Sequence, residues 1–253
     1  MANLLKDKVA IVTGASNGIG RGIAEMFGAE GAKTVLAARR KELLNEVATG
    51  IGKAGGTALA VQADVTSEAA VIGLFEQTRK AYGRVDIVVN NAGIGRAAPI
   101  EDMTLKDWQE MLDINLTAAF LCSREAFRTM KGQKPQGGRI INMGSISSKT
   151  PRPDSLTYTT TKHALEGMTH SLTMDGRKYN IVSSLVRPGA TLSSFTMQRG
   201  RTTYGHGEKP EDYVMAAEDV ARVVVLMASL PPEVNLYDAT ILPNHMKSFI
   251  GRG

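Results

Sequence analysis

Short apolar runs recur along the chain and alternate with segments of helical spacing. The first run, Val9-Ala10-Ile11-Val12-Thr13, is almost wholly apolar, which is typical of a strand buried on both faces of a sheet. Similar runs predict further strands at 34–38, 58–61, 86–90, 139–143, 181–186 and 239–242. Between them, apolar residues three and four positions apart predict helices at 20–30, 40–53, 67–82, 104–130, 155–178 and 218–229.

This alternation predicts an α/β fold, a doubly wound (Rossmann) parallel sheet of seven strands with helices on both faces. No linker, repeat or low-complexity segment divides the sequence, so we expect residues 1–253 to form a single domain. Segment 190–214 departs from the alternation because its periodicity is weak. Such segments are usually lids or binding loops, or else disordered. We expect a substrate-binding lid here, with Phe195, Met197 and Tyr204 in a partly apolar pocket wall.

The composition is that of a globular protein, with 43% hydrophobic and 22% charged residues. No apolar run approaches the roughly 18 residues of a membrane span, and the first residues lack the apolar core of a signal peptide. The single cysteine, Cys122, excludes an internal disulfide framework and a cysteine-rich metal site. We therefore expect a cytoplasmic protein without a membrane partner.

The formal net charge of +5 is spread along the sequence. A mildly basic, solvated surface explains it, and a polyanionic small ligand would also suit it. There is no basic stripe with interleaved aromatic residues, so nucleic acid is not an expected partner. No pair of histidines has the spacing of metal ligands, and we expect no metal site.

A glycine-rich turn, Gly14-Ala15-Ser16-Asn17-Gly18-Ile19-Gly20, lies between the first strand and the first helix. Glycines let the backbone approach a pyrophosphate, and a helix N-terminus supplies N–H groups and a partial positive charge. The position of the turn therefore favours a dinucleotide site over a tight turn that serves packing alone.

The residues after the second strand distinguish the two nicotinamide cofactors. An acid there would accept hydrogen bonds from a ribose 2′-OH, whereas a basic residue would pair with a 2′-phosphate. The sequence reads Ala37-Ala38-Arg39-Arg40-Lys41, without an acid until Glu42. Arg39 is the first candidate for the phosphate because a guanidinium binds it in a fork. Arg40 is the second candidate, or else the solvated start of the next helix. NADP(H) is thus predicted over NAD(H).

Tyr158 and Lys162 lie four residues apart and therefore on one face of a predicted helix. An ammonium beside a phenol favours the phenolate, and a phenol tuned in this way can exchange a proton near neutral pH. The spacing alone is far more often that of a solvated surface helix. The upstream glycine turn makes the pair a candidate for general acid/base chemistry.

Four motifs occur in a fixed order: Thr13-Gly14-x-x-x-Gly18-Ile19-Gly20, Asn90-Asn91-Ala92-Gly93, Tyr158-x-x-x-Lys162 and Pro188-Gly189. Together they resemble the short, single-domain branch of the short-chain dehydrogenase/reductase family. Each motif is common, but the ordered set is specific, and the resemblance extends from about residue 6 to residue 242. The tail after residue 242 departs from the family pattern, as does Arg187, which stands where an asparagine is frequent.

The resemblance assigns roles to four catalytic positions. Tyr158 matches the general acid/base, and Lys162 matches the lysine that lowers its pKa and holds the nicotinamide ribose. Ser145, just past the fifth strand, matches the serine that hydrogen-bonds the substrate carbonyl, and is preferred to Ser147 and Ser148. Asn115 matches the asparagine that positions a proton-relay water.

The resemblance also extends the cofactor site. Asp64 and Val65 match the adenine contacts. The segment Asn91, Ala92 and Gly93 matches the cofactor lining after the fourth strand, and Pro188, Gly189 and Thr191 match the segment beside the nicotinamide. Ligands of parallel sheets bind at the carboxyl ends of the strands, where most of these residues fall.

We therefore expect an NADP(H)-dependent oxidoreductase that interconverts a carbonyl (ketone or aldehyde) and an alcohol, with Tyr158 as general acid/base. One alternative is an NAD(H)-dependent alcohol dehydrogenase that works in oxidation. A less favoured alternative is a dinucleotide-binding sensor without catalysis. The resemblance also implies a homo-oligomer, either a tetramer or a dimer.

Overall fold

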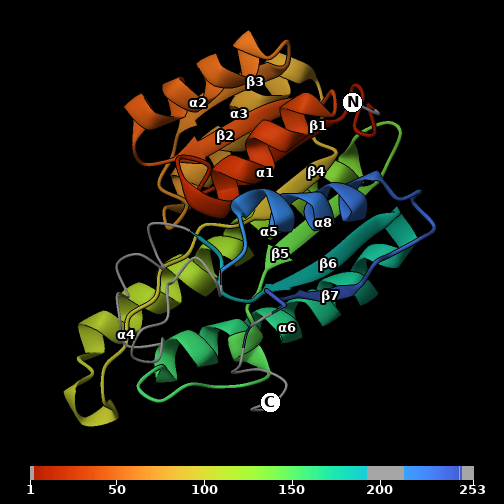
Figure 1. The fold of residues 1–253 in the computed structure, drawn as a ribbon. Helices are drawn as coiled ribbons and strands as arrows, with labels where there is room; N and C mark the ends of the chain where they lie inside the picture. Colours follow the sequence, from red (N-terminus) through yellow and green to blue (C-terminus); the bar gives the residue numbers. More distant parts are fainter. Residues whose placement is uncertain (1–2, 193–213, 245, 247–253) are drawn as a thin grey trace.

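The computed structural model describes residues 3–192, 214–244 and 246. Within them, seven strands form one sheet in which every neighbouring pair is parallel, in the order β3-β2-β1-β4-β5-β6-β7 (Figure 1). The strands are β1 Val9–Thr13, β2 Lys33–Ala38, β3 Thr57–Gln62, β4 Ile87–Asn90, β5 Gly138–Met143, β6 Ile181–Pro188 and β7 Asp238–Ile241. The predicted doubly wound α/β fold is confirmed.

Helices cover both faces of the sheet (Figure 1). They are α1 Gly18–Ala29, α2 Lys41–Lys53, α3 Glu68–Tyr82, α4 Leu105–Leu112, α5 Ala118–Gly132, α6 Leu156–Gly176 and α8 Ala217–Ser229. Apolar residues of α1, α2 and α8 pack on one face, and those of α3 and α5 pack on the other. Each face of the sheet thus has its own hydrophobic core. Strand β1 contributes to both, because Ala10 and Val12 belong to the core under α1, α2 and α8, and Ile11 belongs to the core under α3 and α5. This explains why the strand is apolar at successive positions.

The direction of winding reverses between β1 and β4. The chain runs outward through β2 and β3, then returns to place β4 on the other side of β1, with Ile11 opposite Val88. In doubly wound sheets, the crevice at such a reversal, beyond the carboxyl ends of the strands, is where ligands bind. The glycine turn follows β1, and the Asn91 segment follows β4, so both lie at this crevice.

The predicted helix 104–130 is present, but it contains a π-helical turn that the sequence did not predict. It consists of α4 and α5, joined by a π-helical turn, Asp113–Thr117, with Asn115 buried at its centre. Such turns insert an extra residue and occur often at functional sites. Asn115 forms hydrogen bonds with Ile94 and Thr161 from this turn, which hold its wider geometry in place. A single wide turn leaves the apolar spacing on either side almost unchanged, so the sequence pattern does not reveal it.

The predicted lid is only partly within the described residues. Residues 193–213, including Phe195, Met197 and Tyr204, lie outside them. The flanking residues form a parallel bridge between Thr191 and Met215. The Leu192 amide donates to the Met215 carbonyl at 2.8 Å, and the Met215 amide donates to the Ala190 carbonyl at 2.9 Å. The two ends of the segment are therefore fixed side by side, just past the end of β6.

Among the helices of the described residues, none is both long enough and apolar enough to cross a membrane.

Candidate active site

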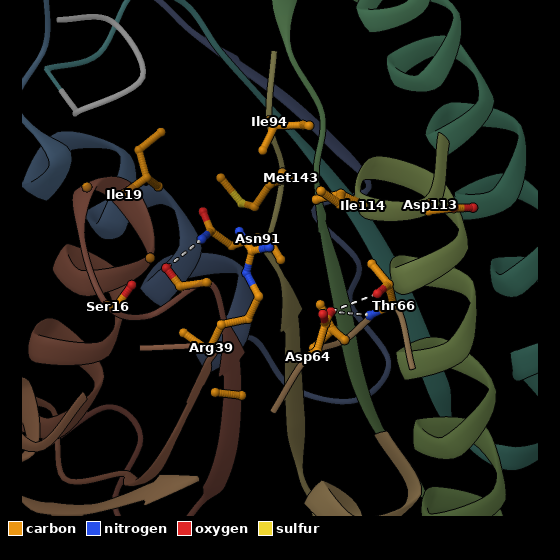
Figure 2. A pocket seen from close by; sticks show the side chains of 18 of the residues that line it. Ser16, Ile19, Arg39, Asp64, Thr66, Asn91, Ile94, Asp113, Ile114 and Met143 are labelled. Atoms are coloured by element: carbon orange, nitrogen blue, oxygen red, sulfur yellow. Dashed lines mark hydrogen bonds between the residues drawn. The ribbon is translucent and has the colours of Figure 1, made fainter. Parts of the chain in front are cut away.

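A cavity of about 860 Å³ lies at the carboxyl ends of the strands (Figure 2). Most of the predicted site residues line it. These are Gly14, Ser16, Asn17, Gly18, Ile19, Gly20, Arg39, Arg40, Asp64, Val65, Asn91, Ala92, Gly93, Tyr158, Lys162 and Pro188. Residues from six separate segments therefore meet around one space, although they are spread over most of the chain.

The glycine turn packs directly against the segment that follows β4. Gly14 has a φ of +66°, a conformation that favours glycine, and a Cβ there would lie 2.9 Å from Asn91 Nδ2. The Asn91 side-chain amide donates to the Thr13 carbonyl at 2.9 Å. Helix α1 begins at Gly18 and has no acidic residue in its first turn. Its N-terminus thus keeps a positive end facing the cavity, as anion binding requires.

Gly20→Ala tests how closely the glycine turn packs against Asn91. The new Cβ would collide with Asn91 Nδ2 and with the Gly14 carbonyl oxygen. Overpacking of this kind costs about 1–3 kcal/mol, so we expect a lower melting temperature and weaker NADPH binding by fluorescence. The matched control is Gly50→Ala on α2, where a Cβ meets nothing within 4 Å, and where alanine should stabilise the helix by about 0.5–1 kcal/mol. Equal stability and binding in Gly20→Ala would contradict the prediction.

The end of β2 places two arginines at the cavity. Figure 2 shows the Arg39 side chain pointing into it, and the Arg40 guanidinium donates to Ser16 Oγ at 3.3 Å. Asp64 lies nearby, and its carboxylate accepts hydrogen bonds from the Thr66 hydroxyl at 2.8 Å and the Thr66 amide at 3.0 Å. Burial alone would raise the pKa of Asp64, but these bonds and the charge of Arg39 outweigh it and lower the pKa.

Tyr158 and Lys162 both line the cavity, and their spacing places them on one face of α6. The Lys162 ammonium lies 5.5 Å from the centroid of the Tyr158 ring. It is buried and donates to the Met143 carbonyl, at the end of β5, at 2.7 Å. Burial lowers the pKa of Lys162, and interaction with Tyr158 partly opposes that shift. The carbonyl and the helix together fix the ammonium beside the phenol.

Ser145 follows β5 and is 7% exposed. Its Oγ accepts a hydrogen bond from the Ser147 amide at 3.1 Å, which leaves the hydroxyl hydrogen as a donor. The neighbouring Ser148 hydroxyl instead donates to the Ser145 carbonyl at 2.8 Å, so it closes the turn. Ser145 itself does not line the cavity, but the adjacent Gly144 does. Ser145 is therefore next in sequence to a cavity residue, and its hydroxyl is held by the turn that follows β5.

Asn115 does not line the cavity either, and its side-chain amide is bound to protein groups. Oδ1 accepts from the Ile94 amide at 2.7 Å, and Nδ2 donates to the Ile94 carbonyl at 2.9 Å and to Thr161 Oγ1 at 3.2 Å. Asn115 therefore ties the segment after β4 to α6, one residue before Lys162. Gly189 and Thr191 also lie off the cavity lining, with the Thr191 hydroxyl donating to the Gly189 carbonyl at 3.1 Å.

Helix α4 and the π-helical turn after it contribute a part of the cavity wall that the sequence did not predict. The additional residues are Lys106, Gln109, Glu110, Asp113 and Ile114. Their spacing of three and four positions is that of one helical face. This spacing could have flagged the helix, but polar residues at helical spacing usually mark a solvated surface. Within the described ranges, no three histidine, cysteine, aspartate or glutamate side chains are grouped so that they could hold a metal ion.

The fold and the cavity together define a dinucleotide-binding protein of the doubly wound α/β class. The model of the short chain dehydrogenase family matches residues 8–203. The chain therefore belongs to the short-chain dehydrogenase/reductase family, whose fold binds a nicotinamide dinucleotide, and it is an oxidoreductase.

Two curated relatives illustrate the similarity. The chain is 31% identical over 251 residues to dehydrogenase/reductase SDR family member 11 of Bos taurus, covering 94% of this chain and 96% of the relative. It is 34% identical over 191 residues to a 3beta-hydroxysteroid dehydrogenase of Mediterraneibacter gnavus, covering 75% of this chain and 68% of the relative.

Two solved structures show the same fold. A short-chain type dehydrogenase/reductase from Mycobacterium marinum superposes with a TM-score of 0.87 at 28% identity, covering 96% of this chain and 98% of that one. An alcohol dehydrogenase from Thermococcus sibiricus, complexed with 5-hydroxy-NADP, has a TM-score of 0.85 at 24% identity and covers 95% and 98%. At that identity, the second likeness concerns the fold alone.

Proposed function

We propose that this protein is an NADP(H)-dependent oxidoreductase that interconverts a carbonyl and an alcohol by hydride transfer. The observation that carries the proposal is the single cavity that joins Arg39, at the end of β2, to Tyr158 and Lys162 on α6. The Arg39 side chain offers a guanidinium to a phosphate, and α6 offers a phenol and an ammonium to a reacting oxygen. A dinucleotide that spans the cavity would connect the two.

The residues present fit an NADP(H) molecule in three respects. The glycines of the Gly14 turn line the cavity at the N-terminus of α1, so the backbone there is open to a pyrophosphate. The residues Arg39 and Arg40 follow β2 where an NAD(H)-specific site would carry an acid. The buried Lys162 offers ammonium hydrogens to ribose hydroxyls in addition to the one given to Met143.

Bound nicotinamide would supply or accept the hydride at the carbonyl carbon. In the direction of reduction, Ser145 donates a hydrogen bond to the carbonyl oxygen as negative charge grows on it. Tyr158 delivers the proton to the same oxygen, and the adjacent Lys162 ammonium stabilises the phenolate that remains. In oxidation, the phenolate takes the proton back from the alcohol.

After Tyr158 gives up its proton, it must be protonated again, and Asn115 fixes the segments beside which this occurs. Its amide holds Ile94 on one side and Thr161 on the other, next to Lys162 in sequence. In the proposed reaction, a water near Lys162 passes the proton to Tyr158, and Asn115 fixes the segments around it.

A substrate screen tests the proposal. The panel contains aldehydes, ketones and acyl-thioester ketones, with loss of NADPH followed by absorbance. It also includes 3-ketosteroids, because one relative is named a 3beta-hydroxysteroid dehydrogenase. Parallel assays with NADH, and with NAD⁺ and alcohols, cover the alternative of an NAD(H)-dependent dehydrogenase working in oxidation. Equal or better use of NADH would contradict the assignment of Arg39.

A further inference from the structure

Glu166 lies on α6 four residues after Lys162, on the same face of the helix and one turn further along. Its Oε1 pairs with two cations from other elements. Lys149 Nζ lies at 3.0 Å and Arg187 Nη2 at 2.9 Å. Lys149 directly follows the short 3-10 helix Ile146–Ser148 that Ser145 begins, and Arg187 directly precedes Pro188 in β6. A single carboxylate oxygen thus connects three segments that each carry or adjoin site residues.

Two side chains of α6 bind residues on either side of Ser145. The residues between these contacts, 144–148, are called the Ser145 turn. On one side, Lys162 donates to the Met143 carbonyl, two residues before Ser145. On the other side, Glu166 binds Lys149, four residues after Ser145. Because Lys162 and Glu166 are adjacent on one helix face, the turn is attached to the helix at both of its ends. The two attachments together restrain Ser145 relative to α6.

Arg187 secures the third segment. Its side chain is 0% exposed and pairs with Asp238 Oδ2 of β7 at 2.8 Å as well as with Glu166. A buried guanidinium is stable only when its charge is paired. The two carboxylates therefore determine where the end of β6 and Pro188 lie relative to α6. The sequence departs from its family here, with arginine where asparagine is frequent, so this three-way contact gives that departure a physical role.

We propose that Glu166 is a positioning residue that holds the Ser145 turn and the Pro188 end of β6 against the Tyr158 helix. This inference rests on the proposed function, because the turn and the strand end would place the substrate carbonyl and the nicotinamide. Hydrogen bonds from Lys149 and Arg187 also outweigh the effect of burial and lower the pKa of Glu166. The carboxylate therefore stays ionised, and its role is to hold other groups in place.

Lys149→Met is the main test because it removes only the ion pair between Lys149 and Glu166. The lysine is 49% exposed, and pairs of this kind contribute about 0–1 kcal/mol to stability. We expect a nearly unchanged melting temperature and NADPH dissociation constant, but a kcat about tenfold lower, because small misplacements of reacting groups are costly. Lys149→Arg should recover most of the loss. The control is Arg222→Met, which breaks an exposed ion pair with Asp219 on α8.

Glu166→Gln provides a second variant that should fold, since Arg187 keeps Asp238 as its partner. In the cofactor-free protein, we expect faster amide hydrogen exchange in residues 144–150 than in the wild type or in Arg222→Met. Unchanged exchange in Glu166→Gln, or a wild-type kcat in Lys149→Met, would overturn the positioning role. Amide exchange in Glu166→Gln can rise as expected while the wild type reduces no carbonyl. In that case the proposed function fails, and the role of Glu166 in holding the Ser145 turn is supported.

Discussion

Replacing Tyr158 with phenylalanine is expected to lower kcat for carbonyl reduction by about 10²–10⁴-fold, the usual contribution of a positioned general acid. The change removes one hydroxyl and keeps the ring that lies 5.5 Å from the Lys162 ammonium. NADPH binding should therefore remain close to that of the wild type. Steady-state kinetics and NADPH fluorescence titration measure the two quantities separately.

The conservative nature of this change makes its outcome informative. Phenylalanine fills the same space on α6, so the fold and the cavity should be preserved, which circular dichroism can verify. Thr159→Val, one residue along the same helix, is the matched control, because it also removes one hydroxyl and Thr159 does not line the cavity. A Tyr158→Phe enzyme with wild-type kcat would exclude Tyr158 as the proton donor.

Replacing Arg39 with serine is expected to weaken NADPH binding selectively. Hydrogen bonds to charged groups contribute about 1.5–3 kcal/mol, which corresponds to roughly 10–100-fold in the dissociation constant. NADH lacks the 2′-phosphate, so its binding should change little. The ratio of kcat/KM for NADPH to that for NADH measures the effect directly.

Two further variants locate the phosphate contact. Arg40→Ser should have a smaller effect than Arg39→Ser, because the Arg40 guanidinium also donates to Ser16. Arg79→Ser, on α3, removes an exposed arginine that does not line the cavity and should change neither cofactor. If Arg39→Ser left the NADPH preference intact while Arg40→Ser abolished it, the order of the two arginines would be reversed.

The sequence predicts the sheet well because its strands have an unusual composition. Strand β1 is apolar at successive positions, and the predicted limits, 9–13, are those of the structure. The pattern is readable because both faces of the strand are buried, with Ile11 and Val12 in different cores. Strands buried on both faces indicate a parallel sheet. The loops after β1, β2 and β4 then lie at one edge of it, so most of the cofactor-site residues could be grouped without coordinates.

Contacts between distant parts of the chain could not be read in this way. Glu166, Arg187 and Asp238 form one ion-pair cluster, but nothing in their local sequence indicates that they meet. The π turn around Asn115 is similar, since it depends on hydrogen bonds to Ile94 and Thr161. In both cases a polar side chain is held by partners that are distant in the sequence. The apolar periodicity used to predict helices and strands does not indicate which polar residues meet.

The choice among the three serines shows where the sequence and the structure complement each other. Proximity to the end of β5 favours Ser145, and the hydrogen bonds give this choice a physical basis. The amide of Ser147 occupies an acceptor position on Ser145 Oγ, whereas the Ser148 hydroxyl is used within the turn. The burial of Ser145, however, follows from packing that the sequence does not encode locally.

The most direct test of the proposed function is the stoichiometry of NADPH oxidation and alcohol formation by the wild-type protein, measured with the best carbonyl of the panel. The proposed mechanism predicts one alcohol formed for each NADPH consumed, with both processes slowed by about 10²–10⁴-fold in Tyr158→Phe. Tight NADPH binding together with no NADPH consumption for all carbonyls of the panel would contradict the proposed mechanism and favour a dinucleotide-binding sensor.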